Sequence, residues 1–371
     1  MNYFEKFVSN TYAAAGNQHF FNMSENERKI SRVFYKITCG GRYNYSLLFS
    51  NIIDSTFANG SISHKNLICN SWTIHSARVG ICKNSLMKKE IKQDEIAKEI
   101  NSNVSFLADL TFDSKPTKVV APGEFFSSDE VLLSFGADDY LCLELEFSGK
   151  MLPYHEESLL PIYSKTGDTW VYDKKMPLAS MIGCDRKVKA KIGYLGDSIT
   201  QGCGTPYNEY KHWSAFAGQM LGCEYAHWNL GLGYGRANDI ASDGAWLYKA
   251  KQNDIIILCC GVNDISQGFA EEQIKKDITT IVDTLKSLGK TVILQTVPPY
   301  NFTEAKGEKW FAVNDYIKTE LINKADYVFE VAPHLCVDAQ NLNMTRFNGH
   351  PNPEGCAIWA KQLYKEINKI I

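Results

Sequence analysis

The stretch Lys191–Gly204, KIGYLGDSITQGCG, decides how the rest of the chain is interpreted. An apolar, β-prone run from Ile192 to Leu195 ends at Gly196, which is typical of a buried strand followed by a tight turn. A helix is predicted soon afterwards, over His212–Leu221. A serine just past the carboxyl end of a buried strand stands at the edge where open α/β sheets bind their ligands. Ser198 is therefore the candidate nucleophile.

The same tripeptide, Gly-Asp-Ser, is also common in ordinary turns, and alone it does not indicate catalysis. It is not the Gly-x-Ser-x-Gly elbow, because Thr200 occupies the position of the second glycine. It is not a phosphate-binding loop, because no Gly-Lys-Ser/Thr follows. The case for Ser198 therefore depends on other parts of the chain.

Size and composition set the broad class. With 371 residues, 44% of them hydrophobic and 22% charged, the chain is expected to be a soluble protein of two domains. A net charge of -3 gives no reason to expect nucleic acid or anionic membranes as partners. Residues 1–20 lack the pattern of a signal peptide, and no stretch reaches the roughly 20 apolar residues of a membrane span.

The eleven cysteines occupy irregular positions and include no C-x-x-C pair. Several lie in apolar runs, as Cys259 and Cys260 do. Buried, reduced thiols in a cytoplasmic protein explain this pattern better than disulfides or zinc. We expect a cytoplasmic location, and neither a metal nor a cofactor.

Residues 1–185 are rich in short β-prone runs separated by Gly, Asn, Asp, Ser and Pro. Leu143, Leu145 and Phe147 alternate with polar residues, as they would in a half-buried strand. Only Asn84–Ile100 is predicted to be helical. This spacing favours an N-terminal antiparallel β-sandwich domain, jelly-roll-like, over 1–185.

The pattern changes near residue 187, where apolar strands begin to alternate with amphipathic helices. Five strands with helices between them predict an α/β domain over 186–371, with a parallel sheet covered on both faces. The expected strands are IGYL, YAHWNL, DIIILCC, TVILQTV and YVFEV, and the expected later helices cover 239–250, 271–288, 309–324 and 353–371.

Three segments could meet Ser198 at the edge of this sheet. The loop Asn229–Arg236, NLGLGYGR, can present backbone N–H groups to a ligand. A dinucleotide-binding loop is the alternative interpretation, but Arg236 stands where the last glycine of that motif should be. Asn263 offers side-chain N–H donors suited to an oxyanion, although it could equally be a helix or turn cap. His350 precedes a firmly capped final helix and could serve as a general base, although a loop histidine is more often plain polar surface.

Four blocks together resemble the SGNH hydrolases, also called GDSL esterases: GDSIT at 196–200, NLGLGYG at 229–235, GVND at 261–264 and GHPN at 349–352. The resemblance covers roughly residues 190–371. It implies a flavodoxin-like three-layer α/β/α fold and ester hydrolysis. Carried over by position, it implies Ser198 as nucleophile and His350 as base. The implied oxyanion hole comprises the Ser198 N–H, a glycine-loop N–H assigned to Gly233, and the Asn263 side chain.

The sequence departs from that family at two positions. Phe347 stands three residues before His350, where the family usually has an aspartate that orients the histidine. Either a backbone carbonyl orients His350 in a Ser-His dyad, which we favour, or an acid comes from elsewhere in the chain. Tyr234 occupies a position that is usually glycine, which leaves open whether Gly233, Tyr234 or Gly235 supplies the amide.

The resemblance is to the two-domain, carbohydrate-esterase-like branch of the superfamily, which pairs a β-sandwich with an SGNH domain. It implies a serine esterase for short acyl esters, acetyl above all, with a small-molecule or carbohydrate substrate. An acyltransferase or thioesterase of the same fold, or a non-catalytic carbohydrate-binding protein, are the alternatives. Aromatic residues of the first domain could stack on sugar rings but are more often core: Tyr43, Tyr45, Trp72, Phe125 and Phe126. The sequence gives no oligomeric state.

Overall fold

The computed structural model describes residues 2–24, 27–58 and 62–371 and divides the chain into two compact units. The first unit comprises residues 1–53, 66–187 and 206–209. The second comprises 54–65, 188–205 and 210–371. The two domains expected from the sequence, 1–185 and 186–371, remain a prediction, because the units are defined by contacts and not as domains.

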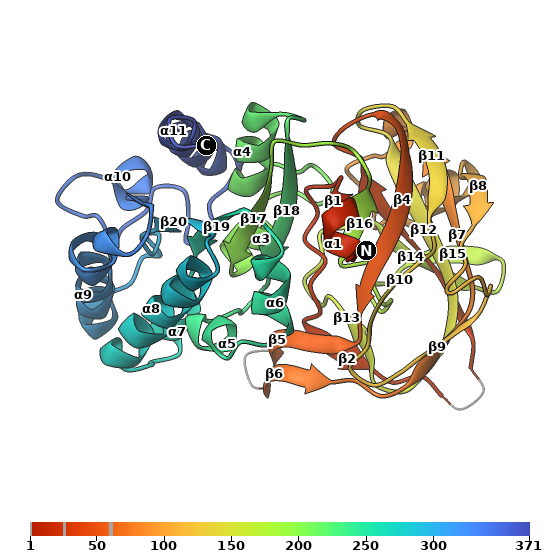
Figure 1. The fold of residues 1–371 in the computed structure, drawn as a ribbon, viewed down its shortest axis with the longest axis horizontal. Helices are drawn as coiled ribbons and strands as arrows, with labels where there is room; N and C mark the ends of the chain where they lie inside the picture. The colour runs from red at the N-terminus through yellow and green to blue at the C-terminus, as the bar shows by residue number, and fades with distance from the viewer. Residues whose placement is uncertain (1, 25–26, 59–61) are drawn as a thin grey trace. The chain divides into compact units, whose positions relative to one another are not determined.

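The first unit is antiparallel and rich in β-strands, as the sequence predicts (Figure 1). One sheet has the order β1-β16-β4-β10, with β11 also paired to β4: Val8–Ser9, Met181–Cys184, Gly41–Ser50, Phe125–Ser127 and Val131–Phe135. A second has the order β15-β14-β3-β12-β7-β8, with β9 paired to β7: Thr169–Tyr172, Ile162–Thr166, Lys29–Lys36, Tyr140–Gly149, Trp72–Cys82, Ser105–Asp109 and Lys118–Val120. Strands β2 (His19–Phe21) and β13 (Leu152–Tyr154) form a separate pair.

Strand β12 shows why these residues form a sheet. Leu143 and Leu145 are fully buried, whereas the alternating Glu144 lies on the other face. There Glu144 accepts hydrogen bonds from Arg32 and Arg78 on the two neighbouring strands, at 2.6 Å each. The alternation predicted for this segment is confirmed. The aromatic residues Tyr45, Trp72 and Phe126 are buried, so they belong to the core.

The prediction of one helix over 84–100 is largely wrong. A short 3-10 turn covers Asn84–Leu86, and the α-helix α2 covers only Asp94–Ser102. Met87, at the end of the 3-10 turn, is extended with ψ 94°. The helix begins where two acidic residues, Asp94 and Glu95, can interact favourably with the helix N-terminus. A further short helix, α1 (Tyr3–Lys6), lies near the N-terminus.

The second unit holds a five-stranded parallel sheet, as predicted (Figure 1). Its order is β18-β17-β19-β20-β21, or 2-1-3-4-5 in chain order, which is the flavodoxin-like arrangement. The strands are β17 (Ala190–Gly196), β18 (Tyr225–Gly231), β19 (Ile255–Cys259), β20 (Thr291–Gln295) and β21 (Tyr327–Phe329). In this order β17 lies between β18 and β19, so the segments that follow these three strands converge at one edge.

Helices cover both faces of this sheet and complete the α/β/α layers (Figure 1). On one face α4 and α11 pack together, with the indoles of Trp213 and Trp359 stacked at 4.9 Å. The helices of the unit are α3 (Ser198–Gln201), α4 (Trp213–Leu221), α5 (Ala237–Ala241), α6 (Ala245–Lys251), α7 (Val262–Ser266), α8 (Glu271–Ser287), α9 (Glu304–Thr319), α10 (Ala332–Leu335) and α11 (Pro353–Ile367), with a 3-10 turn over Leu321–Asn323.

Two further helix predictions, both in the second unit, are wrong in their bounds. The helix expected over 239–250 is interrupted, because Asp243 has a left-handed φ of 53° and ends one helix before Gly244 begins the next. The helix expected over 309–324 begins five residues earlier, at residue 304, and ends at Thr319. Helix boundaries of this kind are set by single residues and are the least predictable feature of the pattern.

Residues 54–65 belong to the second unit although they precede most of the first in sequence. They come from the paired strands β5 (Ile52–Ala58) and β6 (Ile62–Ile68). Asp54 forms an ion pair with Lys249 at 2.5 Å, and both side chains are at most 1% exposed. Ser55 also donates to the Asp239 carboxylate. Sequence periodicity cannot reveal such a long-range anchor.

In the described part of the chain, no helix is both long and apolar enough to cross a bilayer. Most cysteines carry free thiols, as expected: Cys69, Cys82, Cys142, Cys184, Cys203, Cys259, Cys260, Cys336 and Cys356. The expectation of reduced thiols is wrong for Cys39 and Cys223, which are disulfide-bonded.

Candidate active site

Ser198 lies at the first position of α3, directly after β17 and its N-cap residue Asp197. The Asp197 carboxylate accepts a hydrogen bond from the Ile199 N–H at 3.0 Å, which fixes this tight turn. Close packing against β18 holds the turn at the sheet edge: a Cβ on Gly231 would lie 2.1 Å from the backbone nitrogen of Gln201. The strand-turn-helix geometry therefore presents the Ser198 hydroxyl at the carboxyl end of the sheet.

His350 reaches Ser198 from the other end of the unit's sequence. Its Nε2 lies 2.8 Å from the Ser198 Oγ. The start of α11 anchors the segment that carries it, because Asn352 accepts from the Gly355 N–H at 2.9 Å. Gly204 permits the approach: a Cβ there would lie 2.7 Å from the His350 carbonyl oxygen. The structure thus brings the predicted nucleophile and the predicted base into hydrogen-bonding contact.

The surroundings of His350 favour its neutral form. Burial lowers the pKa of the imidazole below its ordinary value of 6.5. Among the described residues, no carboxylate forms a hydrogen bond or an ion pair with this ring. The nearest partner of Nδ1 is instead the Tyr300 hydroxyl, at 3.5 Å. Phe347, at the position of the family's aspartate, is buried against the first turn of α11, where a Cβ on Gly355 would lie 2.8 Å from its ring.

Asn263 lies in the first turn of α7, which follows β19. Its Nδ2 donates one hydrogen bond to the Gly235 carbonyl, at 2.9 Å. Because an amide nitrogen carries two hydrogens, this contact orients the side chain and leaves a second donor. The contact also joins α7 to the glycine loop after β18, so two of the predicted segments meet.

The amide of Gly233, the glycine-loop donor predicted from the sequence, already has a partner within the protein. The Gly233 N–H donates to the Gln201 side-chain oxygen at 2.6 Å, so an oxyanion would have to displace this bond. The Gly235 N–H donates to the Leu232 carbonyl at 3.0 Å. Tyr234, between them, has a left-handed φ of 59°, a conformation that favours glycine.

Two buried acids near these segments were not identified from the sequence. Burial raises the pKa of Asp197 to about 7 and that of Asp264 to about 6. Asp264 accepts from the Ala237 N–H at 2.9 Å and so fixes the chain that leaves the glycine loop. Both are positioned to hold backbone in place, and neither contacts His350. Their burial could have been inferred only from the tertiary fold.

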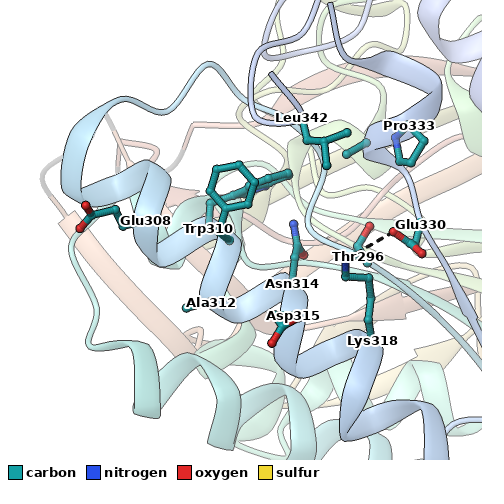
Figure 2. A pocket seen from close by; sticks show the side chains of 12 residues that line it. Thr296, Glu308, Trp310, Ala312, Asn314, Asp315, Lys318, Glu330, Pro333 and Leu342 are labelled. Carbon is teal, nitrogen blue, oxygen red and sulfur yellow. Dashed lines mark ion pairs between the residues drawn. The ribbon is translucent and has the colours of Figure 1, made fainter. Parts of the chain in front are cut away.

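A cavity of about 520 Å³ lies beside α9 (Figure 2). Trp310 and Asn314 of α9 line it, with the ion pair of Lys318 and Glu330 on its polar side. None of the predicted site residues lines this cavity. In the part of the chain described here, no three His, Cys, Asp or Glu side chains are grouped so that they could hold a metal ion.

A serine hydroxyl in contact with a neutral imidazole, next to N–H donors, is the arrangement used for nucleophilic acyl transfer. The imidazole can take the hydroxyl proton as the serine attacks and return it to the leaving group. The site therefore has the groups that ester cleavage requires.

A known protein family is similar to this part of the chain, and its members are acylhydrolases by name. Residues 194–358 match the GDSL-like lipase/acylhydrolase family. No curated protein is similar enough to count as a match. Among solved structures, a putative lipolytic protein of the G-D-S-L family from Desulfitobacterium hafniense is 22% identical, with TM-score 0.41, over 47% of this chain and 98% of its own.

Two other solved structures are similar to different extents of the chain. A family two carbohydrate esterase from Cellvibrio japonicus is 13% identical, with TM-score 0.38, and the similarity covers 98% of this chain and 96% of that one. An acetyl xylan esterase, AlAXEase, is 17% identical, with TM-score 0.39, over 48% of this chain and 99% of its own.

Proposed function

Because this chain belongs, through residues 194–358, to the GDSL-like lipase/acylhydrolase family of the SGNH superfamily, we propose that it is a serine esterase acting through an acyl-enzyme. The observation that carries the proposal is the 2.8 Å contact between Ser198 Oγ and His350 Nε2. In the first step His350 takes the Ser198 proton while Oγ attacks the ester carbonyl, and then protonates the departing alcohol. In the second step water, activated by the same imidazole, attacks the acyl-serine and releases the acid.

The oxyanion formed in each step needs N–H donors aimed at one point. We assign one to the backbone N–H of Ser198, at the start of α3, and one to the second Nδ2 hydrogen of Asn263. The third is the glycine-loop N–H that the sequence assigns to Gly233. This N–H donates to the Gln201 side chain at 2.6 Å, so it would exchange that bond for one to the oxyanion.

Asn263→Ala should lower kcat by about two orders of magnitude, because single oxyanion donors are worth about 3 kcal/mol. KM and the unfolding midpoint should change little. The matched control is Asn323→Ala, which removes an exposed asparagine of the same unit and should leave kcat unaltered. Steady-state kinetics with a chromogenic acetate ester checks both variants. Full activity of Asn263→Ala would remove this residue from the oxyanion hole.

The substrate we propose is a short acyl ester, acetyl above all, carried by a small molecule or a carbohydrate. The support is the resemblance of the four motif blocks to the SGNH hydrolases, together with the β-rich first unit, because the carbohydrate-esterase branch pairs a β-sandwich with an SGNH domain. Rates for acetate, butyrate and octanoate esters of one chromogenic alcohol give the acyl preference. Release of acetate from acetylated oligosaccharides tests the carbohydrate part. A preference for octanoate would contradict the proposal.

An acyltransferase would transfer the acyl group from the same acyl-enzyme to an acceptor other than water. The proposal that water is the acceptor therefore needs its own test. Product analysis with and without an added sugar alcohol separates hydrolysis from acyl transfer. We expect free acid as the main product in both conditions, and a coenzyme A thioester should react more slowly than the acetate ester.

A further inference from the structure

We propose that Tyr300 is a positioning residue that orients the His350 imidazole through its phenolic hydroxyl, in the place of the missing aspartate. This inference rests on the proposed esterase function. Tyr300 lies in the segment between β20 and α9, far in sequence from both Ser198 and His350. Its hydroxyl is 3.5 Å from Nδ1, the ring nitrogen that faces away from the serine.

The two rings also make a fixed contact. They meet edge to face, with centroids 5.5 Å apart and planes 77° apart. The residue before His350 must be small for this contact, because a Cβ on Gly349 would lie 2.9 Å from the Tyr300 ring. Tyr300 therefore restricts the imidazole both by ring packing and by the polar contact at Nδ1.

The segment that carries Tyr300 is held by buried side chains on the side of α9. Trp310 and Asn314, which Figure 2 shows projecting from α9, contact the backbone just before Tyr300. The Trp310 indole donates to the carbonyls of Val297 and Pro298, both at 3.0 Å. The Asn314 side chain donates to the Val297 carbonyl at 3.0 Å and accepts from its N–H at 2.7 Å.

A second set of bonds holds the segment after Tyr300. Asn301 has a left-handed φ of 57°, and its side chain accepts from the Thr345 N–H at 2.8 Å. Asn343 accepts from the Phe302 N–H at 3.2 Å. These bonds tie the Tyr300 segment to the chain that leads to His350. Hydrogen bonds therefore hold the backbone both before and after Tyr300. A side chain that orients another residue needs such support.

The contact selects one tautomer of His350. For Ser198 to be deprotonated, Nε2 must accept its proton, so Nδ1 carries the ring hydrogen. That hydrogen can be donated to the Tyr300 oxygen. A phenol is neutral, so it stabilises the imidazolium less than a carboxylate does.

The test is Tyr300→Phe, which keeps the ring and removes only the hydroxyl. We expect kcat for a chromogenic acetate ester to fall about 3- to 10-fold, the range for loss of one hydrogen bond, with KM unchanged. The wild-type profile of kcat/KM against pH should have its acid limb below 6.5, since burial already favours the neutral imidazole. In Tyr300→Phe this limb should move to still lower pH, because the imidazolium loses its acceptor.

Tyr316→Phe is the matched control, because the Tyr316 hydroxyl forms a hydrogen bond with Thr279, at 3.0 Å, between α8 and α9. This variant should leave kcat and the acid limb unchanged. Unchanged kinetics in Tyr300→Phe would overturn the proposal, and so would a loss of kcat without a shift of the limb. An increase of kcat in Tyr300→Phe would also overturn it, because the Tyr300 hydroxyl would then donate to Nδ1 and stabilise the unproductive tautomer of His350.

A readout that does not need activity separates this inference from the proposed function. Titration of His350 by NMR in the Ser198→Ala background should give a lower imidazole pKa when Tyr300→Phe is added. An inactive wild type with this shift would reject the esterase and retain the contact. An active wild type without the shift would reject the role of Tyr300 alone.

Discussion

Ser198→Ala is expected to reduce the hydrolysis of a chromogenic acetate ester by about 10⁶-fold, to the level left by binding and the oxyanion donors. The reason is chemical: without Oγ no acyl-enzyme forms, and water would have to attack the bound ester directly. The loss should appear in kcat and kcat/KM together. Substrate binding should survive, because the substitution removes one hydroxyl and leaves the other residues of the site in place.

Ser214→Ala is the matched control for that substitution. Ser214 is a buried serine of α4 that bonds to His212 at 2.8 Å and does not contact His350. It should retain most of the wild-type activity, after allowance for any change in stability. If Ser198→Ala kept more than a small fraction of the wild-type rate, the nucleophile would have to be another residue.

His350→Ala is expected to have the second large effect, again about 10⁶-fold in kcat. The Ser198 hydroxyl would lose its only proton acceptor among the described side chains. The substitution also opens space where the ring was, so added imidazole should restore part of the activity in a concentration-dependent way. His334→Ala, a histidine that packs on Phe329, should behave like the wild type and should not respond to imidazole.

Failure of the rescue would not by itself contradict the role of His350, so the deciding comparison is between rates. Equal turnover for His350→Ala and the wild type would remove the base from the mechanism. A loss in His350→Ala that matches the loss in Ser198→Ala, with no further loss in the double variant, is the expected result for two residues that act as one unit.

Much of the fold could be predicted because its strands are continuous apolar runs. The five parallel strands are buried on both faces of their sheet and are therefore apolar throughout, whereas β12 alternates because its two faces differ. Helix ends were less predictable, because single residues such as Asp243 decide them. The anchoring of Asp54 to Lys249 could not be predicted, because the two residues are 195 positions apart and no local pattern links them.

The site shows the same division between local and long-range information. Ser198, Asn263 and His350 stand at the ends of elements, where motif and periodicity indicate them. The loop pattern predicts the amide of Gly233 as a donor, but no local pattern shows that this N–H already donates to Gln201. Tyr300 gives no signal in the sequence, since its contact with His350 spans 50 residues and depends on how the segment after β20 folds back.

The most direct measurement for the central claim is covalent labelling with a small organophosphonate ester, followed by mass spectrometry of the digested protein. The account predicts one adduct per chain, on the peptide that contains Ser198, with none in Ser198→Ala and much slower labelling in His350→Ala. An adduct on a different residue, or unmodified protein from an enzyme that still hydrolyses esters, would contradict it.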